Sequence, residues 1–235
     1  MIRMTKAAIL IDGGYFLTRL PVVRPDVDAA NAKAVADSVG QLVHSHLRQL
    51  NEALRVPSPA SLLYRSFYYD ARPYDRKGHT AVDKRAIDYS KTEQAIFRNE
   101  LFEALRRRPN LALRLGEVRR DSDRAWILKP EPQRRLLRGE ITFNDVSDRD
   151  FAAALRQKGV DMRIGLDIAA ITLKRQAEIV VLVSGDADFV PAAKLARREG
   201  MQFILDPLWQ NVSRDLFEHI DGLRSGFSRP RRSLQ

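Results

Sequence analysis

Four short apolar segments of this chain each run into acidic residues, and stretches with helical spacing of apolar residues separate them. Apolar runs of this length predict buried strands. Strands that alternate with helices predict an α/β fold in which helices cover both faces of a mostly parallel sheet of about five strands. The segments and the acidic residues that follow them are 7–11 with Asp12, 62–69 with Asp70, 179–183 with Asp186, and 201–205 with Asp206.

The remaining elements follow from periodicity and from breaker residues. A further strand is expected at 111–118, residues 71–90 are expected to form a loop, and 119–147 an insertion of loops with a short hairpin. Apolar spacing and capping residues predict the helices. Their expected ranges are 15–20, 29–54, 91–108, 150–157, 160–176, 189–199 and 211–219.

Length and composition set the domain organisation and the classes of partner. We expect one domain over residues 1–224, with an insertion around 119–147, followed by a basic flexible tail at 225–235. The absence of cysteine excludes disulfides and thiolate metal sites and fits the cytoplasm. The longest apolar runs are too short to span a membrane. A net charge of +10 favours a polyanionic partner, most often nucleic acid.

The acidic residues at the strand ends form the candidate site. Ligands of open α/β sheets bind at the carboxyl ends of the strands. If strands 7–11 and 179–183 are neighbours, Asp12, Asp186 and Asp188 share one pocket. Close carboxylates repel one another, and a hard cation such as Mg²⁺ or Mn²⁺ relieves the repulsion. Asp188 has a simpler interpretation as the cap of the helix that begins near Phe189.

The segment QKGVDMRIGLDIAA adds two more carboxylates, Asp161 and Asp167. On a helix they lie roughly 120° apart, so they need not face the same point. Asp161 also has a simpler role, because a negative charge favours the first turn of a helix. Asp167 lies in the middle of the expected helix, where a solvated face is the alternative.

Three blocks in this order, AILIDGGYF, KGVDMRIGLDIA and VVLVSGDADFVPAAKLARREG, resemble the NYN domain in its bacterial LabA-like (DUF88) form. This is a branch of the PIN-like ribonuclease superfamily. The resemblance covers roughly residues 5–20 and 157–207. It implies a three-layer PIN-like (Rossmannoid) fold, endonucleolytic cleavage of RNA, and acidic residues gathered around Mg²⁺ or Mn²⁺.

The resemblance also assigns roles to individual residues. It implies metal-assisted hydrolysis of phosphodiester bonds, in which bound cations activate water and stabilise negative charge. The acidic catalytic and metal-binding set is Asp12, Asp161, Asp186 and Asp188, with Asp167 as a further candidate ligand. The candidates for substrate binding are Ser184, Tyr15, Lys158, Arg163 and Lys194.

Two alternatives stay open. Many NYN members have asparagine three residues after the first aspartate, where this chain has Tyr15, so a weakly active or inactive module that binds RNA or protein is the main alternative. A haloacid-dehalogenase-like phosphatase needs a second aspartate at the place of Gly14 and ranks low. DNA stays open as a substrate, and the apolar, aromatic-rich middle of the chain is compatible with a homodimer.

Overall fold

The computed structural model describes residues 5–121 and 125–230. Contacts divide the chain into two compact units. We call residues 1–70, 100–116 and 159–235 the core unit, and residues 71–99 and 117–158 the inserted unit. Residues 231–235 of the expected basic tail lie outside the described ranges.

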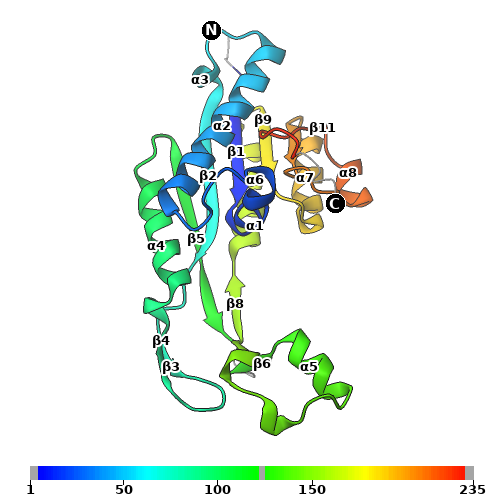
Figure 1. Ribbon diagram of the computed structural model, residues 1–235. Helices are drawn as coiled ribbons and strands as arrows, with labels where there is room; N and C mark the ends of the chain where they lie inside the picture. The colour runs from blue at the N-terminus through cyan, green and yellow to red at the C-terminus, as the bar shows by residue number, and fades with distance from the viewer. Residues whose placement is uncertain (1–4, 122–124, 231–235) are drawn as a thin grey trace. The chain divides into compact units, whose positions relative to one another are not determined.

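A seven-stranded sheet runs in the order β11-β10-β9-β1-β2-β5-β8, and its middle strands belong to the core unit (Figure 1). The contacts from β11 through β10, β9 and β1 to β2 are all parallel. The strands are β1 (Ala7–Asp12), β2 (Leu63–Arg72), β5 (Leu111–Arg120), β8 (Leu155–Lys158), β9 (Ile179–Val183), β10 (Gln202–Asp206) and β11 (Gly222–Leu223).

Helices of the core unit pack on this sheet because each carries an apolar face. On α2, buried residues such as Val35, Val39 and Leu42 recur at helical spacing and form part of the core. The blue α1 and α2 cross in front of the sheet in Figure 1. The helices are α1 (Gly13–Val23), α2 (Ala32–Leu54), α3 (Pro59–Leu62), α4 (Glu93–Arg106), α6 (Val160–Leu173), α7 (Val190–Arg198) and α8 (Arg214–Glu218), and α4 begins in the inserted unit. Within the described residues, no helix is long and apolar enough to cross a membrane.

The inserted unit consists of short elements between these strands. A hairpin of β3 (Lys77–His79) and β4 (Ala86–Asp88) and a second antiparallel pair, β6 (Trp126–Leu128) with β7 (Phe151–Ala153), are its small sheets. The helix α5 (Pro130–Leu137) and three short 3₁₀ turns, Tyr89–Lys91, Phe143–Asp145 and Asp148–Asp150, complete it.

The mixed α/β fold with a mostly parallel sheet confirms the expected class, but three local predictions were wrong. The main sheet has seven strands, not about five, because the short edge strands β8 and β11 join it. Residues 150–157 form β7 and β8, not a helix, because Leu155–Lys158 pair with residues 117–120 of β5. That pairing overrides the weak helix preference of the alanine-rich segment. Residues 71–90 contain the β3–β4 hairpin.

A buried carboxylate, Asp206 at the end of β10, joins the last segment of the core unit to α2. It accepts hydrogen bonds from the backbone of Leu208 at 2.8 Å and of Gly226 at 2.9 Å, and from the Ser225 hydroxyl at 3.0 Å. The Nε2 atom of buried His46 lies 2.8 Å from its other side, at Oδ2. With four partners, this aspartate is structurally satisfied despite its burial.

We expect Asp206→Asn to lower the free energy of unfolding by about 2–4 kcal/mol, because an amide nitrogen would then face groups that donate hydrogen bonds. Denaturant unfolding measures the change. Asp26→Asn is the control, since it breaks an exposed ion pair with Arg24 and should change stability little. Equal effects of the two substitutions would contradict this role for Asp206.

Candidate active site

The first acidic side chain, Asp12, lies where β1 passes directly into α1. It is the N-cap of that helix, and its Oδ1 accepts a hydrogen bond from the backbone N–H of Tyr15 at 3.1 Å. The next residue must be glycine, because a Cβ at Gly13 would lie 2.5 Å from the carbonyl oxygen of Tyr69. This close approach of the chain to β2 lets the helix start directly at the edge of the sheet.

Ser184 connects Asp12 to the loop after β9. The strands β1 and β9 are parallel neighbours, and Ile11 lies opposite Val183, so Asp12 and Ser184 come next in register. The buried hydroxyl of Ser184 donates to Asp12 Oδ2 at 3.3 Å and accepts from the backbone N–H of Asp186 at 3.4 Å. The two aspartates therefore open onto the same edge of the sheet.

Asp161 approaches this edge from α6. It follows Gly159, whose φ of +76° at the start of the helix suits glycine, and it lies in the first turn. Asp161 is exposed, but partial desolvation raises its pKa, and the carboxylates of Asp186 and Asp188 raise it further. We call Asp12, Asp161, Asp186 and Asp188 the acidic cluster.

Burial also raises the pKa of Asp12, to about 6, and outweighs the hydrogen bonds from Tyr15 and Ser184 that lower it. Nearby Asp161 and Asp70 add to the rise. Two members of the cluster thus have raised pKa values for the same reasons, burial and neighbouring negative charge. The loop itself is held by a local bond, in which Asp186 Oδ1 accepts from the backbone N–H of Asp188 at 2.9 Å.

Asp167, also predicted as a candidate ligand, lies on another part of α6 and has its own partners. Its Oδ2 accepts from the hydroxyl of Tyr69 at 2.9 Å and from Arg114 Nε at 3.0 Å. These bonds join α6 to β2 and β5. Burial, reinforced by Asp167, raises the pKa of Tyr69, so this hydroxyl stays a donor. Through these hydrogen bonds Asp167 connects the helix to the sheet.

The predicted substrate-binding side chains differ in their surroundings. Tyr15 reaches toward β10, where its hydroxyl donates to the carbonyl oxygen of Pro207 at 2.5 Å, and burial raises its pKa to about 12. Arg163 is exposed and donates to the backbone of Gly159 at 2.7 Å. Lys158, in the inserted unit, and Lys194, on α7, are exposed.

Comparison with known proteins shows which family the chain belongs to. Residues 99–221 match the family model of the NYN domain. The chain belongs to the NYN domain family. The matched range contains three members of the acidic cluster, whereas Asp12 lies before it. NYN domains have a PIN-like fold and are generally ribonucleases.

No curated protein matches the chain. Among solved structures, the crystal structure of a protein of unknown function from Vibrio parahaemolyticus matches with a TM-score of 0.44 and 16% identity. That match covers 97% of this chain and 98% of the other.

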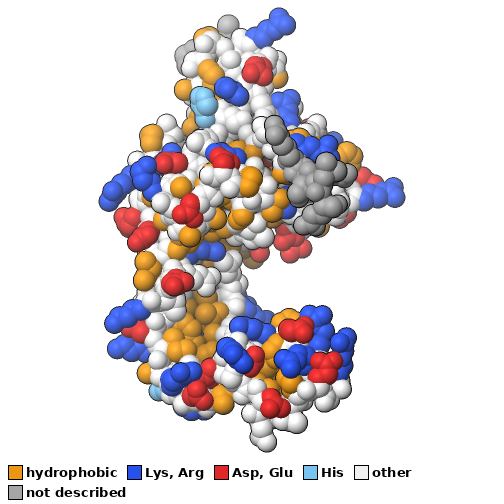
Figure 2. All heavy atoms as spheres, viewed as in Figure 1, with side chains coloured by type: hydrophobic (Ala, Val, Ile, Leu, Met, Phe, Trp, Pro, Cys, Tyr) orange, Lys and Arg blue, Asp and Glu red, His pale blue; other side chains and the backbone are white. Residues whose placement is uncertain are grey.

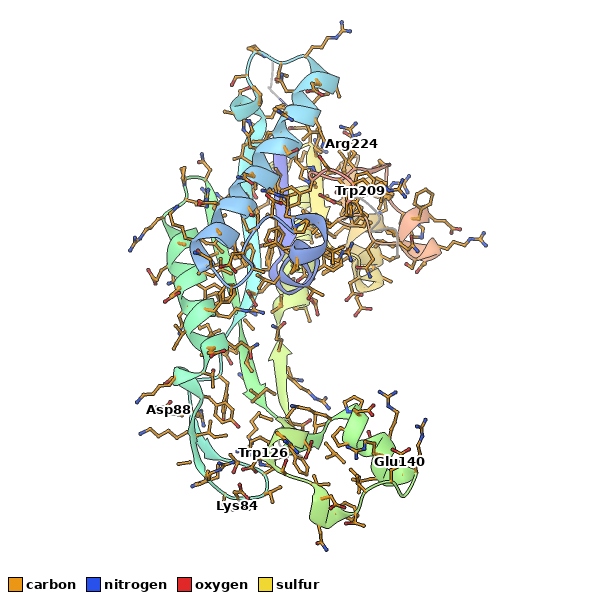
Figure 3. The ribbon with its side chains drawn as sticks, viewed as in Figure 1. Lys84, Asp88, Trp126, Glu140, Trp209 and Arg224 are labelled. Atoms are coloured by element: carbon orange, nitrogen blue, oxygen red, sulfur yellow. The ribbon has the colours of Figure 1, made fainter. Side chains whose placement is uncertain are left out.

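One feature at this edge of the NYN domain was missed in the sequence, the exposed Trp209 after β10 (Figure 3). Leu208 and Trp209 both have left-handed backbone, with φ of 44° and 64°, which is costly for residues other than glycine. The turn is held by Tyr15 at Pro207 and by Arg19, which donates to the Leu208 carbonyl at 2.9 Å. The signal in the sequence was a tryptophan three residues beyond the acidic end of a strand.

Trp209 is 44% exposed although its indole N–H donates to the Phe227 carbonyl at 2.8 Å. The guanidinium carbon of Arg229 lies 5.8 Å from the ring centroid. Because Tyr15 contacts both the N-cap Asp12 and Pro207, this turn belongs to the same edge of the sheet as the acidic cluster.

The donor atoms of the acidic cluster suit a hard divalent cation, because all of them are carboxylate oxygens. Over residues 5–121 and 125–230, however, no three histidine, aspartate or glutamate side chains are grouped so that they could hold a metal ion. Asp12 directs both oxygens to protein donors, and Asp186 directs one to the loop backbone. The chemistry of the donor atoms therefore fits a cation, although the described side chains are not grouped as a metal site.

We expect Asp12→Asn to stabilise the metal-free protein at about pH 7.5 by about 1–3 kcal/mol. The folded pKa of about 6 lies above the ordinary 3.8, so the folded state holds the proton more tightly than the unfolded state. Stability therefore falls as the pH rises from about 4 to about 6, and the amide removes this loss. Melting temperatures in EDTA should differ at pH 7.5 and converge near pH 4; a difference that does not change with pH contradicts the prediction.

Proposed function

We propose that this NYN domain is a metal-dependent endoribonuclease that hydrolyses RNA phosphodiester bonds at the acidic cluster. One observation supports the proposal: Asp161 on α6 is close enough to interact with the charges of Asp12, at the end of β1, and of Asp186 and Asp188, in the loop after β9. The pKa values of Asp12 and Asp161 are raised there, mainly by burial and further by the negative charge of neighbouring carboxylates. Perturbed carboxylates at a strand edge are a frequent property of catalytic sites.

Asp12, Asp161 and Asp186 are the residues that would hold Mg²⁺ or Mn²⁺, with Asp188 as an outer partner. When bound, such a cation activates water and neutralises charge on the phosphoryl group. Ser184 orients Asp12 through the hydroxyl bond at 3.3 Å, and α1 fixes the other oxygen of that carboxylate. The carboxylates would otherwise repel the phosphate, so we infer that the cation is needed for RNA to approach them.

The alternative, a weakly active or inactive module that binds RNA or protein, rests on Tyr15. The phenol is bonded to Pro207 and contacts the loop at Gly185, where a Cβ would lie 3.0 Å from the ring. Tyr15 thus takes the place of a family asparagine without supplying an amide. The cleavage experiment described next distinguishes this alternative from the nuclease.

We expect Asp186→Asn to reduce the rate of RNA cleavage in Mn²⁺ by about 100-fold or more, since a lost cation ligand removes several kcal/mol of charge stabilisation. Cleavage of a labelled single-stranded RNA, resolved on a gel, measures the rate. Asp215→Asn is the matched control, because Asp215 is an exposed residue of α8. Unchanged cleavage by the Asp186→Asn protein would contradict the proposal.

Cation binding is measured separately from cleavage. Mn²⁺ should raise the melting temperature of the wild-type and Asp215→Asn proteins and should have a much smaller effect on Asp186→Asn. A cation-dependent rise without cleavage in the wild type would favour the inactive binding module.

We further propose that Trp209 stacks on a base of the RNA next to the acidic cluster. Trp209→Leu should weaken binding of single-stranded RNA about 5- to 100-fold, because stacking of a base on an aromatic ring contributes about 1–3 kcal/mol. Trp209→Phe should keep most of the affinity. Filter binding of a cleavage-resistant RNA analogue in Mn²⁺ measures this, and equal losses in the leucine and phenylalanine variants would assign Trp209 to structure alone.

A further inference from the structure

The inserted unit contains a concave surface that is separate in the chain from the acidic cluster. It has a volume of about 910 Å³ and is lined by the β3–β4 hairpin on one side and by Arg120, Ala125 and Trp126 on the other. We call it the basic groove and define it by Lys77, His79, Lys84, Arg120 and Trp126. Figure 3 shows Lys84 on the hairpin and Trp126 on β6.

The groove is strongly positive. Of the described residues that line it, none is acidic. Lys77, Lys84 and Arg120 are exposed, and within residues 5–121 and 125–230 no ion pair involves any of them. The inserted unit has 17 lysines and arginines against 12 acidic residues, a net charge of +5, so it holds half of the excess charge in 71 of the 235 residues. Figure 2 shows lysine and arginine gathered over α5 of the same unit.

Asp148, which does not line the groove, holds the loop of the β3–β4 hairpin in place. Asp148 accepts hydrogen bonds from the backbone N–H groups of Val82 at 2.7 Å and Asp83 at 3.2 Å in the hairpin loop. It also pairs with Arg85 at 3.0 Å. These bonds hold the Asp148 pKa well below its usual range against the opposing effect of desolvation. Arg85 is thereby neutralised, while Lys84 on the same loop keeps an uncompensated charge.

Trp126 gives the groove an aromatic surface. It is half-buried, and the guanidinium carbon of Arg120 lies 5.7 Å from its ring centroid. Arg120 also comes close to the hairpin, since a Cβ at Gly78 would lie 4.0 Å from its Nη1. Arg120 thus places a planar cation beside the Trp126 ring, and Lys77 and Lys84 line the same groove. This combination of cations and an aromatic ring recurs in sites for single-stranded nucleic acid.

We propose that the basic groove binds single-stranded RNA, with Lys77, Lys84 and Arg120 on the phosphates and an unpaired base stacked on Trp126. A described lining with basic and no acidic residues favours a polyanion. The accessible part of the half-buried Trp126 ring favours unpaired bases, because paired bases offer no free face inside a duplex. The choice of RNA rests on the proposed function, whereas the groove itself does not use the acidic cluster.

The two tryptophans of the chain allow a direct test. In Trp209→Phe, Trp126 is the sole tryptophan, and its fluorescence is titrated with a single-stranded oligoribonucleotide in EDTA, where cleavage is blocked. We expect saturable quenching that weakens with salt. Adding Lys77→Glu and Lys84→Glu should weaken binding at least 10-fold and lower the log–log salt slope by about 1.4, the value for two lost phosphate contacts.

The matched control is Arg134→Glu with Arg135→Glu, which makes the same charge change on α5 outside the groove. It should weaken binding no more than about threefold, as a general effect of net charge. Circular dichroism confirms that both double variants fold. Equal losses in the two double variants, unchanged Trp126 fluorescence, or equal quenching by duplex RNA or heparin would each overturn the proposal.

The outcome is distinguishable from that of the proposed function. Quenching that persists when Asp186→Asn is added to the Trp209→Phe protein supports the groove and the acidic cluster as separate sites. Cleavage without quenching at Trp126 contradicts the groove and leaves the nuclease. Quenching of Trp126 in the Trp209→Phe protein, together with no RNA cleavage by the wild type, supports the groove and contradicts the nuclease.

Discussion

The parallel pairing of β1 with β9 is the constraint on which the candidate site depends. Five residues of each strand lie in register, from Ala7 opposite Ile179 to Ile11 opposite Val183, and all ten are buried. Backbone hydrogen bonds and the packed core fix this register, so Asp12 and Ser184 must leave the sheet side by side. The carboxylates beyond them have no freedom to separate by moving the strands. Burial is the main cause of the raised pKa of Asp12 and Asp161, and the repulsion among these carboxylates adds to it.

Three aspartates of the core unit have different surroundings, and the differences indicate which of them is a candidate for catalysis. Asp206 is buried among four partners that compensate its burial. Asp167 faces Arg114 and a tyrosine hydroxyl, which compensate its charge. Asp12 has two hydrogen bonds, and the charged groups that raise its pKa are other carboxylates. A carboxylate without a compensating cation inside a well-packed fold lowers stability, so a structural role does not explain its presence. This contrast supports a functional role for the acidic cluster.

Much of the central sheet could be predicted because its strands are apolar runs buried on both faces, as in Ile179–Val183. The edge strand Leu155–Lys158 has no such run; three of its four residues are exposed, and only its pairing with β5 makes it a strand. The role of Asp167 could not be predicted either, because its partners Tyr69 and Arg114 are 98 and 53 residues away in sequence. Trp209 was missed because the strain that marks it is a property of backbone angles.

Under the proposed function, the distribution of charge assigns the two units different parts in binding a polyanion. The core unit has 23 lysines and arginines against 18 acidic residues, so its net charge of +5 equals that of the much smaller inserted unit. Within the core unit the sheet edge that we assign to catalysis carries converging carboxylates, which repel phosphate in the absence of a cation. Attraction that does not depend on a cation must therefore come from other surfaces, and the basic groove supplies uncompensated cations next to an aromatic ring. Under the proposed function, this separation of attraction from chemistry would let the protein retain RNA before the cation binds and cleave it only once the cation is bound.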